Sequence, residues 1–421
     1  MKKLLLMCLI ALVTFPLIAK GTYENWDGET ITIAGGRGYE EAIENAFPGI
    51  DVIPIDVDQT TGENITVTAL IASGNAPDIY VGFAGRAGQY LVPEYAMPLD
   101  IDESVWDQAV LDTYKKGGVL YGLPFSLPVQ GMAINTDVTD AAGYDIPERA
   151  WTIFDYLEML EAIKKSGYEG DPTYLYAGSP SADYFWLNWF SAFGVELYDE
   201  GYTRSTFNDT EAGVEVMTFL KYLVDNGLSP AASATNTVNE VLPGFREGKI
   251  ATTGFRPNWI PPHIQTAIDQ GKIDKAFGYT VKPFPVKPGV VWPAPIPGVG
   301  TCVLAHVTEN PDKAKVLTDL VVFIADTAQQ PAYGDILTRF DVELTDEAQA
   351  LRAADPITLE IIDYTAKGGF MDPGYCFEWY DETRSAALPI LRDLYNGVVT
   401  PEQAAKQYED AINAILKEYA E

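Results

Sequence analysis

Apolar residues are distributed along the chain in two alternating patterns: short blocks rich in β-branched residues, and longer segments in which apolar residues recur every three or four positions. Gly, Pro or Asp bound the short blocks, as is typical of strand ends. Strands that alternate with helices predict α/β domains with largely parallel sheets. We expect strands at Ile31–Ala34, Val52–Val57, Asp78–Val81, Gly131–Asn135, Lys249–Thr253 and Cys302–Ala305.

Capping motifs mark where several helices begin. Thr400–Gln403, TPEQ, is a capping box with proline at the first helical position, and the apolar residues behind it share one face. From about Thr345 onward the chain has helical patterns only. Similar signals predict helices that begin at Thr152–Asp155 and Asn310–Lys313, and one that spans Asp209–Asn226 and ends at Gly227.

Two segments rich in proline and glycine, Tyr121–Gly131 and Lys282–Gly300, are also apolar, whereas disordered linkers are usually polar. They indicate extended chain that crosses between two packed bodies. A chain of 421 residues is also too long for one hydrophobic core. Two crossings mean that the second domain interrupts the first.

The composition is strongly acidic, with 60 Asp and Glu against 28 Lys and Arg and a formal net charge of -32. Phosphate contacts require a basic surface, so this charge excludes a nucleic-acid partner. We interpret the acidity as a diffuse, solvated surface, because no block of like charges stands out.

Signals for catalysis are scarce. The two histidines, His263 and His306, lie far apart in the sequence, and no His, Cys or carboxylate group has the spacing of a metal site. The stretch Gly35–Glu40, GGRGYE, lacks the third glycine of a dinucleotide-binding loop. We therefore expect no catalytic residues, no metal and no cofactor. A polysaccharide-active enzyme with paired carboxylates remains the rival hypothesis, because 60 acids provide many pairs.

The first residues have the layout of a signal peptide, with two lysines before the uncharged apolar run Leu4–Ala19. This run is shorter than the roughly 20 residues of a membrane-spanning helix. We expect cleavage after Ala19, export to the periplasm or cell exterior, and no lipid anchor at Cys8. Cys302 and Cys376 remain after cleavage, and the sequence leaves open whether they pair.

Three stretches occur in an order and spacing typical of a known family: Asn75–Asp100, Gly118–Asp137 and Phe245–Gly254. On these stretches the chain resembles the family 1 extracellular solute-binding proteins, the maltose-binding-protein-like receptors of ABC sugar importers. The resemblance covers nearly the whole mature chain. It implies the α/β, two-lobed periplasmic-binding-protein fold, also called the Venus flytrap. In this fold each lobe has a central sheet flanked by helices, and the C-terminus is all-helical.

The resemblance also implies how the chain divides. We expect a signal peptide over residues 1–19, a first lobe over 20–126 plus 299–340, and a second lobe over 131–297 plus 345–421. The crossings are expected near 126–131, 297–300 and 340–345. The implied function is capture of a carbohydrate between the lobes by a monomer that delivers it to permease subunits, without catalysis. A receptor for another small solute is the alternative.

Two first-lobe loops are similar to sugar-binding loops of the family. In Ile33–Ala42, which also contains Tyr39, Arg37 matches the family's lysine, while Gly36 replaces its acid. In Gly82–Tyr90, Arg86 matches an arginine, Phe83 lies one position from the stacking aromatic, and Gly85 replaces an acid. The two missing carboxylates argue against maltose itself as the ligand. Tyr39, Arg37, Arg86 and Phe83 are the first-lobe candidates.

Five of the eight residues of Asp183–Phe190, DYFWLNWF, are aromatic, and the resemblance places this stretch at a ligand-stacking helix of the second lobe. Flat rings cover the C–H faces of a sugar, while polar side chains pair with its hydroxyls. We expect Tyr184 and Trp186 to face the ligand and the other three rings to be core. Further candidates are Phe255, Arg256 and Trp259 after one strand, Trp379 or Tyr380 at a helix start, and Ser126 and Gln130 in the first crossing.

Arginine is scarce in this acidic chain, so its positions near the expected site are informative. If Arg37, Arg86 and Arg256 converged on one groove, they would admit an acidic sugar such as a uronate through bidentate pairing.

Overall fold

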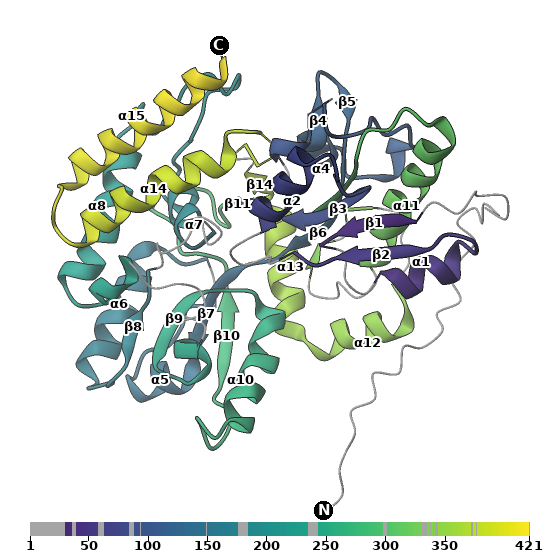
Figure 1. Ribbon diagram of the computed structural model, residues 1–421. Helices are drawn as coiled ribbons and strands as arrows, with labels where there is room; N and C mark the ends of the chain where they lie inside the picture. The colour runs from purple at the N-terminus through teal and green to yellow at the C-terminus, as the bar shows by residue number, and fades with distance from the viewer. Residues whose placement is uncertain are drawn as a thin grey trace, which may run out of the picture.

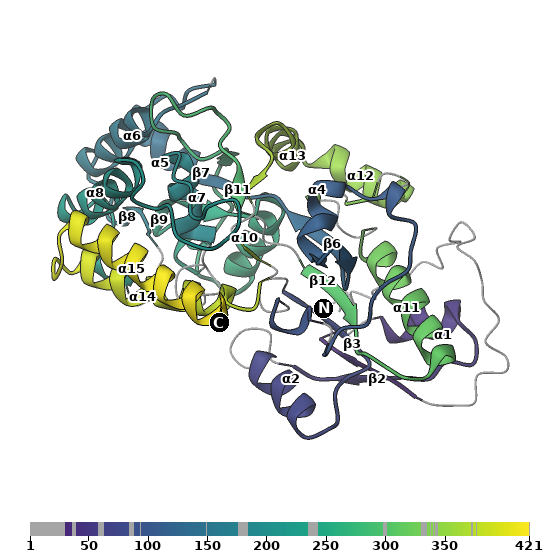
Figure 2. The same cartoon turned by 90° about the horizontal axis from the view of Figure 1, so that it is seen from above.

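A computed structural model describes residues 30–35, 39–57, 63–83, 88–92, 94–148, 150–175, 184–234, 243–297, 301–329, 335–336, 338–339, 341, 344–371, 374–375 and 377–420. These residues form two bodies that lie side by side, each built on its own sheet (Figures 1 and 2). We call the body that contains β1 the first lobe and the body that contains β7 the second lobe.

The first lobe has a six-stranded sheet. Its strands β1 and β2 run parallel, as do β1 and β3, whereas β12 is antiparallel to β3 and β6, and β13 is antiparallel to β6. In spatial order the strands are β13 (Asp335–Ile336), β6 (Leu123–Pro128), β12 (Thr301–Ala305), β3 (Ile79–Phe83), β1 (Ile31–Ala34) and β2 (Val52–Ile55).

Helices cover this sheet (Figure 1). The longest, α11 (Pro311–Gln329), begins at the expected cap, where the Asn310 side-chain oxygen accepts from the backbone N–H of Asp312 at 3.0 Å. The other elements of this lobe are α1 (Glu40–Ala46), α2 (Glu63–Ala72), η1 (Gly88–Tyr90), η2 (Glu103–Val105), α4 (Gln108–Leu111), η3 (Asp112–Tyr114) and the hairpin of β4 (Lys115–Lys116) and β5 (Val119–Leu120).

The second lobe has a four-stranded sheet in the order β10 (Tyr279–Lys282), β7 (Gly131–Asn135), β9 (Ile250–Phe255) and β8 (Asp171–Thr173). Strand β7 is antiparallel to both β10 and β9, and β8 is parallel to β9. The helices of the second body are α5 (Thr136–Ala141), α6 (Ile153–Lys165), α7 (Tyr184–Ala192), α8 (Ala212–Asp225), η5 (Ala231–Ala234), η6 (Pro257–Trp259), α10 (Ile260–Asp269), α14 (Tyr380–Tyr395) and α15 (Pro401–Ala420).

The expected capping boxes are confirmed. The Thr152 side chain accepts from the N–H of Asp155 while the Asp155 carboxylate accepts from the N–H of Thr152. At the start of α15, Gln403 N–H donates to the Thr400 hydroxyl at 3.3 Å, and Thr400 N–H donates to the Gln403 side chain at 2.9 Å. These local signals depend on residues three apart, so the sequence predicted them well.

The expectation of largely parallel sheets is wrong for both lobes. Parallel neighbours need a crossover connection of a dozen or more residues, as between β1 and β2. By contrast, β12 enters the first sheet from the second lobe, and β7 follows β6 with only two residues between them, so these strands join their sheets in the opposite direction.

The C-terminal part is helical, with one short strand among its described residues. Strand β14 (Phe370–Met371) pairs in parallel with β11 (Ile296–Pro297), so the C-terminal region contacts the second proline-rich segment. Helices α12 (Asp346–Ala354) and α13 (Pro356–Gly368) run along the side of both bodies (Figures 1 and 2). Within the described part of the chain, no helix is long and apolar enough to cross a membrane.

Candidate functional site

The first crossing fixes where the two lobes meet. Strand β6 ends at Pro128, β7 begins at Gly131, and the two residues between them, Val129 and Gln130, are buried. Gly131 is paired with Phe255, the last residue of β9. The segment that follows β9 therefore emerges beside the crossing, at the edge of the second sheet that adjoins the first lobe. We call this edge the junction.

Helix α7 packs on the junction. A Cβ atom placed on Gly254 would lie 3.2 Å from the Phe185 ring, so that glycine lets the helix approach β9 closely. The Asn188 amide donates to the Gln130 side-chain oxygen at 3.3 Å, and both side chains are buried. Two of the segments that the sequence assigns to the site, the first crossing and the aromatic helix, are therefore in contact.

Gln130 and Asn188 line a cavity of about 10 Å³, room for one water molecule at most, together with residues of the second crossing and α13. The Gln130 Nε2 atom is buried and has no hydrogen-bond partner among the described residues. A buried amide donor without a partner carries a desolvation cost of about 1–3 kcal/mol. This donor is the kind of group that a polar ligand could satisfy.

Most rings of the aromatic helix are core, as expected. Trp189 packs on Tyr156, Phe219 and Phe284 at centroid distances of 4.9–5.3 Å. Phe190 packs on Phe207 at 5.0 Å. Phe185 is buried in a third cluster beside β9. Tyr184 is the first residue of α7, and its side chain lies outside the described part of the structure.

Trp186 is enclosed by the second lobe, with 1% of its surface exposed. Its ring lies 5.3 Å from that of Phe190, and the Arg384 guanidinium lies 5.7 Å from its centroid. The Trp186 Nε1 atom has no hydrogen-bond partner within the described residues. In this conformation Trp186 presents no open surface to a ligand.

Arg384 is a site feature that sequence reasoning missed. It is fully buried at 0% exposure, and its guanidinium lies 4.5 Å over the Tyr380 ring. Its Nη2 atom is 3.5 Å from the Tyr198 hydroxyl. The signal was available in the sequence, because an aromatic residue and an arginine four positions apart share one helix face.

The start of α14 joins the two lobes. The Trp379 ring is stacked on Phe377, with centroids 5.0 Å apart, and belongs to the second-lobe core. Tyr380 is stacked on Tyr375 at 4.5 Å, and both are buried with the first-lobe core. The Lys116 ammonium group of β4, in the first lobe, lies 4.1 Å over the Phe377 ring.

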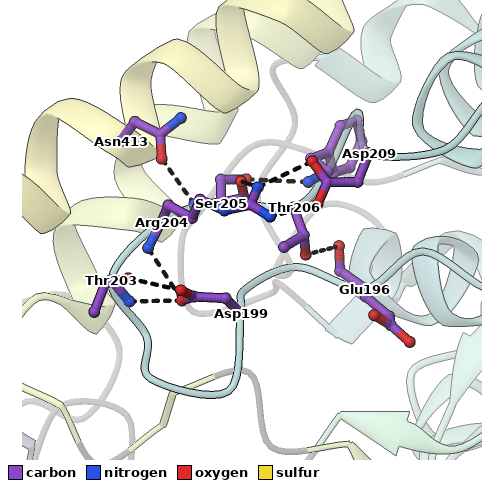
Figure 3. A network of polar contacts seen from close by, with 9 residues as sticks. Glu196, Asp199, Thr203, Arg204, Ser205, Thr206, Asp209 and Asn413 are labelled. Carbon is purple, nitrogen blue, oxygen red and sulfur yellow. Dashed lines mark hydrogen bonds and ion pairs between the residues drawn. The ribbon is translucent and has the colours of Figure 1, made fainter.

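A polar loop supports this aromatic group from the second lobe (Figure 3). The Asp199 carboxylate accepts from Thr203 and Arg204, and these hydrogen bonds hold the pKa of Asp199 below its usual range. Figure 3 also shows Ser205 bonded to Asn413 of α15 at 2.7 Å. Within the loop Tyr202 has a φ of 52°, and its ring lies 4.7 Å from that of Phe377.

Among the predicted ligand-binding rings whose side chains the structure describes, only Trp259, in the segment after β9, is exposed. Phe255 is buried, whereas Trp259 is 37% exposed. The Arg256 guanidinium lies 4.4 Å over the Trp259 ring. Of the predicted platforms in the described structure, this Arg256–Trp259 pair is the most accessible.

Two of the first-lobe candidates, Phe83 and Ser126, lie on the two strands that flank β12 in the first sheet. Phe83 ends β3, Ser126 lies in β6, and both are paired with Thr301 of β12, so three adjacent strands bring them close together. The side chains of Phe83 and Ser126 are outside the described structure, as are Arg37 and Arg86 entirely. Tyr39 precedes α1 and packs against the first-lobe core, and burial raises its pKa to about 12.

Residues 30–331 match the model of the family described as bacterial extracellular solute-binding protein. The chain belongs to this family. Three solved structures share its fold. The GacH receptor of Streptomyces glaucescens has a TM-score of 0.72 and 18% identity, covering 92% of this chain and 98% of that one. An ABC transporter solute-binding protein from Thermotoga lettingae has a TM-score of 0.72 and 18% identity, covering 92% of this chain and 100% of that one. The sugar-binding protein MalE of Xanthomonas citri has a TM-score of 0.69 and 15% identity, covering 93% of this chain and 98% of that one.

This solute-binding protein therefore has the expected two-lobed fold, and its family places it in the periplasm or at the cell exterior. The pairing of the two cysteines and the expected absence of a metal stay open. Cys302 is buried in β12, but Cys376 lies outside the described residues. The residues that the structure describes contain no cluster of three His, Cys, Asp or Glu that could hold a metal ion.

A larger hollow of about 510 Å³ lies away from the junction, between α6 and α8 of the solute-binding protein. Its lining is mostly apolar, with Leu157, Phe193 and Phe219 among its residues. Glu211, Glu215, Thr218 and Tyr222 also line it, but nearly all of its exposed surface is apolar, which suits an apolar ligand better than the hydroxyls of a sugar. The junction, with its amides, arginine and rings, suits a polar ligand better.

Proposed function

We propose that this solute-binding protein captures a carbohydrate between its lobes and delivers it intact to the permease of an ABC importer. The observation that carries the proposal is the Arg256–Trp259 pair, which presents a partly exposed ring and a guanidinium directly after β9, whose last residue pairs with Gly131 beside Gln130. A ring offers a surface for the apolar face of a sugar, and the amides and guanidinium match its hydroxyls.

The structural neighbours support this ligand class. The Streptomyces receptor was determined with acarbose, and the Thermotoga protein was determined with α-D-tagatose. At 18% identity these likenesses establish the fold, so the ligand of the present protein is inferred from its own junction.

The lobe boundaries are part of the proposal. We place the first lobe at 20–126 plus 299–340 and the second at 131–297 plus 345–421, with a signal peptide at 1–19 that directs export. Ligand that contacts both lobes favours the closed form by its differential affinity for that form. The permease then recognises the closed form.

Most of the predicted residues have a place in this scheme. Trp259 is the accessible platform of the second lobe, with Arg256 and Gln130 as its polar partners. Trp379 and Tyr380 are enclosed where the two cores meet, and we propose that ligand reaches them only when the lobes separate. Trp186 is a core residue of the second lobe and has no ligand contact in this scheme. On the first lobe, the proposed contacts are Arg37, Tyr39, Phe83, Arg86 and Ser126.

A binding experiment tests the function. The mature protein is unfolded and refolded to remove co-purified ligand, then titrated with neutral and acidic oligosaccharides while its tryptophan fluorescence is followed. The bound sugar is recovered and weighed by mass spectrometry. Saturable binding with an unchanged sugar supports the receptor.

Two results would replace this function by another. Cleaved sugar in the recovered fraction indicates the polysaccharide-active enzyme. Binding of amino acids, polyamines or peptides in place of sugars indicates a receptor for another solute.

A further inference from the structure

The charge of the chain is unevenly distributed. Residues 243–297, which form β9, α10, β10 and the second proline-rich segment, contain seven Lys and Arg against three Asp and Glu, a net charge of four positive. The whole chain has a net charge of -32. This segment also supplies the Arg256–Trp259 pair of the junction.

A histidine and two arginines of this segment lie around the end of β9. His263, in the first turn of α10, lies edge-on to Phe255, with centroids 5.7 Å apart, and 6.3 Å from the Trp259 ring. Phe245 is stacked on Phe255 at 5.7 Å, and the adjacent Arg246 is close enough to His263 for its charge to act on the imidazole. Burial lowers the pKa of the His263 imidazole, and the nearby positive charge of Arg246 lowers it further.

Two of the three acids of the segment interact with other groups. Glu247 forms an ion pair with Lys249 at 2.6 Å, and Asp269 accepts from Gln265 at 2.8 Å. Arg246 makes no ion pair within the described residues, and its buried Nε atom has no hydrogen-bond partner there. A guanidinium N–H that is withdrawn from water without a partner has a desolvation cost, which a hydrogen bond to an anion would offset.

We propose that Arg246, Arg256, His263 and Trp259 form an anion-recognition site, which binds a carboxylate or sulfate group on the carbohydrate that the receptor carries. This inference rests on the proposed function and narrows its ligand to acidic carbohydrates. The guanidinium groups present paired N–H donors that match two anion oxygens, and Trp259 covers the sugar ring that bears the anion. Because the site is local, it attracts the anion despite the repulsive net charge of the protein.

The test compares ligands that differ only in charge. Oligomers of galacturonate, glucuronate and mannuronate are each titrated beside their methyl esters, and a sulfated neutral oligosaccharide is titrated beside its unsulfated form. We expect at least one charged member to bind about 10- to 100-fold more tightly than its neutral partner, as expected for a charge-assisted hydrogen bond. The uronate and sulfate arms distinguish the two sources of the anion.

Variants then locate the effect. Arg256→Gln and Arg246→Gln are expected to reduce the preference for the charged member to a few-fold. Affinity for the neutral member should stay nearly constant in Arg246→Gln, because Arg246 is not among the proposed contacts to sugar hydroxyls. Arg256→Lys keeps the positive charge but loses the paired N–H donors of the guanidinium, so it should retain only part of the preference for the charged member. Arg392→Gln is the matched control, because Arg392 is an exposed arginine near the end of α14. Circular dichroism verifies that each variant is folded.

The outcomes separate this inference from the function. If sugars bind but charged and neutral partners bind equally, the anion site is wrong and the receptor stands. The same conclusion follows if a charge preference exists but Arg246→Gln and Arg256→Gln leave it intact. If no sugar of any kind binds, both proposals fail.

Discussion

Trp379 and Tyr380 are adjacent in the sequence, yet their rings are buried in different hydrophobic cores. Trp379 lies in the second-lobe core, whereas Tyr380 lies with the first-lobe core beside Tyr375. The start of α14 therefore cannot move with one lobe alone without exposing a ring to water. Fully burying such a ring stabilises by about 1.5–3 kcal/mol, so this segment contributes to the balance between separated and closed lobes.

Lys116 contributes to the same balance from the first lobe, because its ammonium group lies 4.1 Å over the Phe377 ring. A cation–π contact of this kind is worth about 0.5–1 kcal/mol at a solvent-accessible position. We predict that Lys116→Gln weakens sugar affinity about two- to fivefold, because the closed form loses this contact. Titration calorimetry measures the affinity, and small-angle scattering should show a larger radius of gyration at subsaturating ligand.

Lys406→Gln is the control for this change. Lys406 is exposed on α15 and forms an ion pair only within its own helix, with Asp410 at 2.8 Å. Its substitution should leave affinity and scattering unaltered. Equal effects from both lysine variants would point to net charge, and the contact with Phe377 would then have no special role.

Trp259 and Trp186 should respond in opposite ways to truncation. Trp259→Ala removes a partly exposed ring, so we predict a change in unfolding free energy within about 0.5 kcal/mol and a loss of sugar affinity of about tenfold. Trp186→Ala leaves a cavity in the second-lobe core and should cost about 3–5 kcal/mol of stability. Urea denaturation and ligand titration of the two variants check both statements.

Each variant serves as the control for the other, since both lose one of the eight tryptophans. Loss of stability in Trp259→Ala with unchanged affinity would reverse the assignment and make Trp259 a structural residue. In that case the ligand platform would have to be sought among the rings of the first lobe.

Local features of this protein could be predicted from its sequence because they depend on neighbouring residues. The strand Gly131–Asn135 and the caps at Thr152, Asn310 and Thr400 were predicted at the positions where they occur. The helix predicted over Asp209–Asn226 begins later, at Ala212, because Asp209 forms an ion pair with Arg204 in the preceding loop.

Features that depend on distant residues were missed. The antiparallel entry of β12 follows from its arrival from the other lobe, which no local pattern encodes. The sequence places Arg384 on one helix face with Tyr380, but its contact with Trp186, almost two hundred positions earlier in the chain, depends on how the second lobe packs. Similarly, the proximity of Arg246 and His263 requires the return of the chain through β9. The sequence could name candidate rings, but their burial depended on how the lobes pack.

The cap of the last helix offers a direct check on the local reasoning. Thr400→Ala removes the acceptor for the Gln403 N–H, and we predict a loss of about 1 kcal/mol in unfolding free energy. Thr400→Ser keeps the hydroxyl and should recover most of this loss. Chemical denaturation compares the three proteins, and equal stability of all three would mean that solvent replaces the cap at no cost.

His263 should give the unliganded protein a measurable pH dependence. Burial and then the charge of Arg246 lower the pKa of the folded-state imidazole below its ordinary value. The unfolded chain therefore binds a proton more readily than the folded one. The contribution of His263 to stability is fully present above the unfolded-state pKa of about 6.5 and is lost as the pH falls from there through the folded-state pKa.

We predict that His263→Gln removes the part of the stability loss at low pH that comes from protonation of His263. Wild type then loses more unfolding free energy than the variant as the pH is lowered from 7.5 toward 5.5, and the difference between the two proteins narrows. Urea denaturation at half-unit pH intervals measures the difference and cancels the titration of carboxylates that both proteins share. A constant difference across this range for His263→Gln would show that the imidazole is not desolvated, and the electrostatic setting inferred for the Arg246–His263 pair would then be wrong.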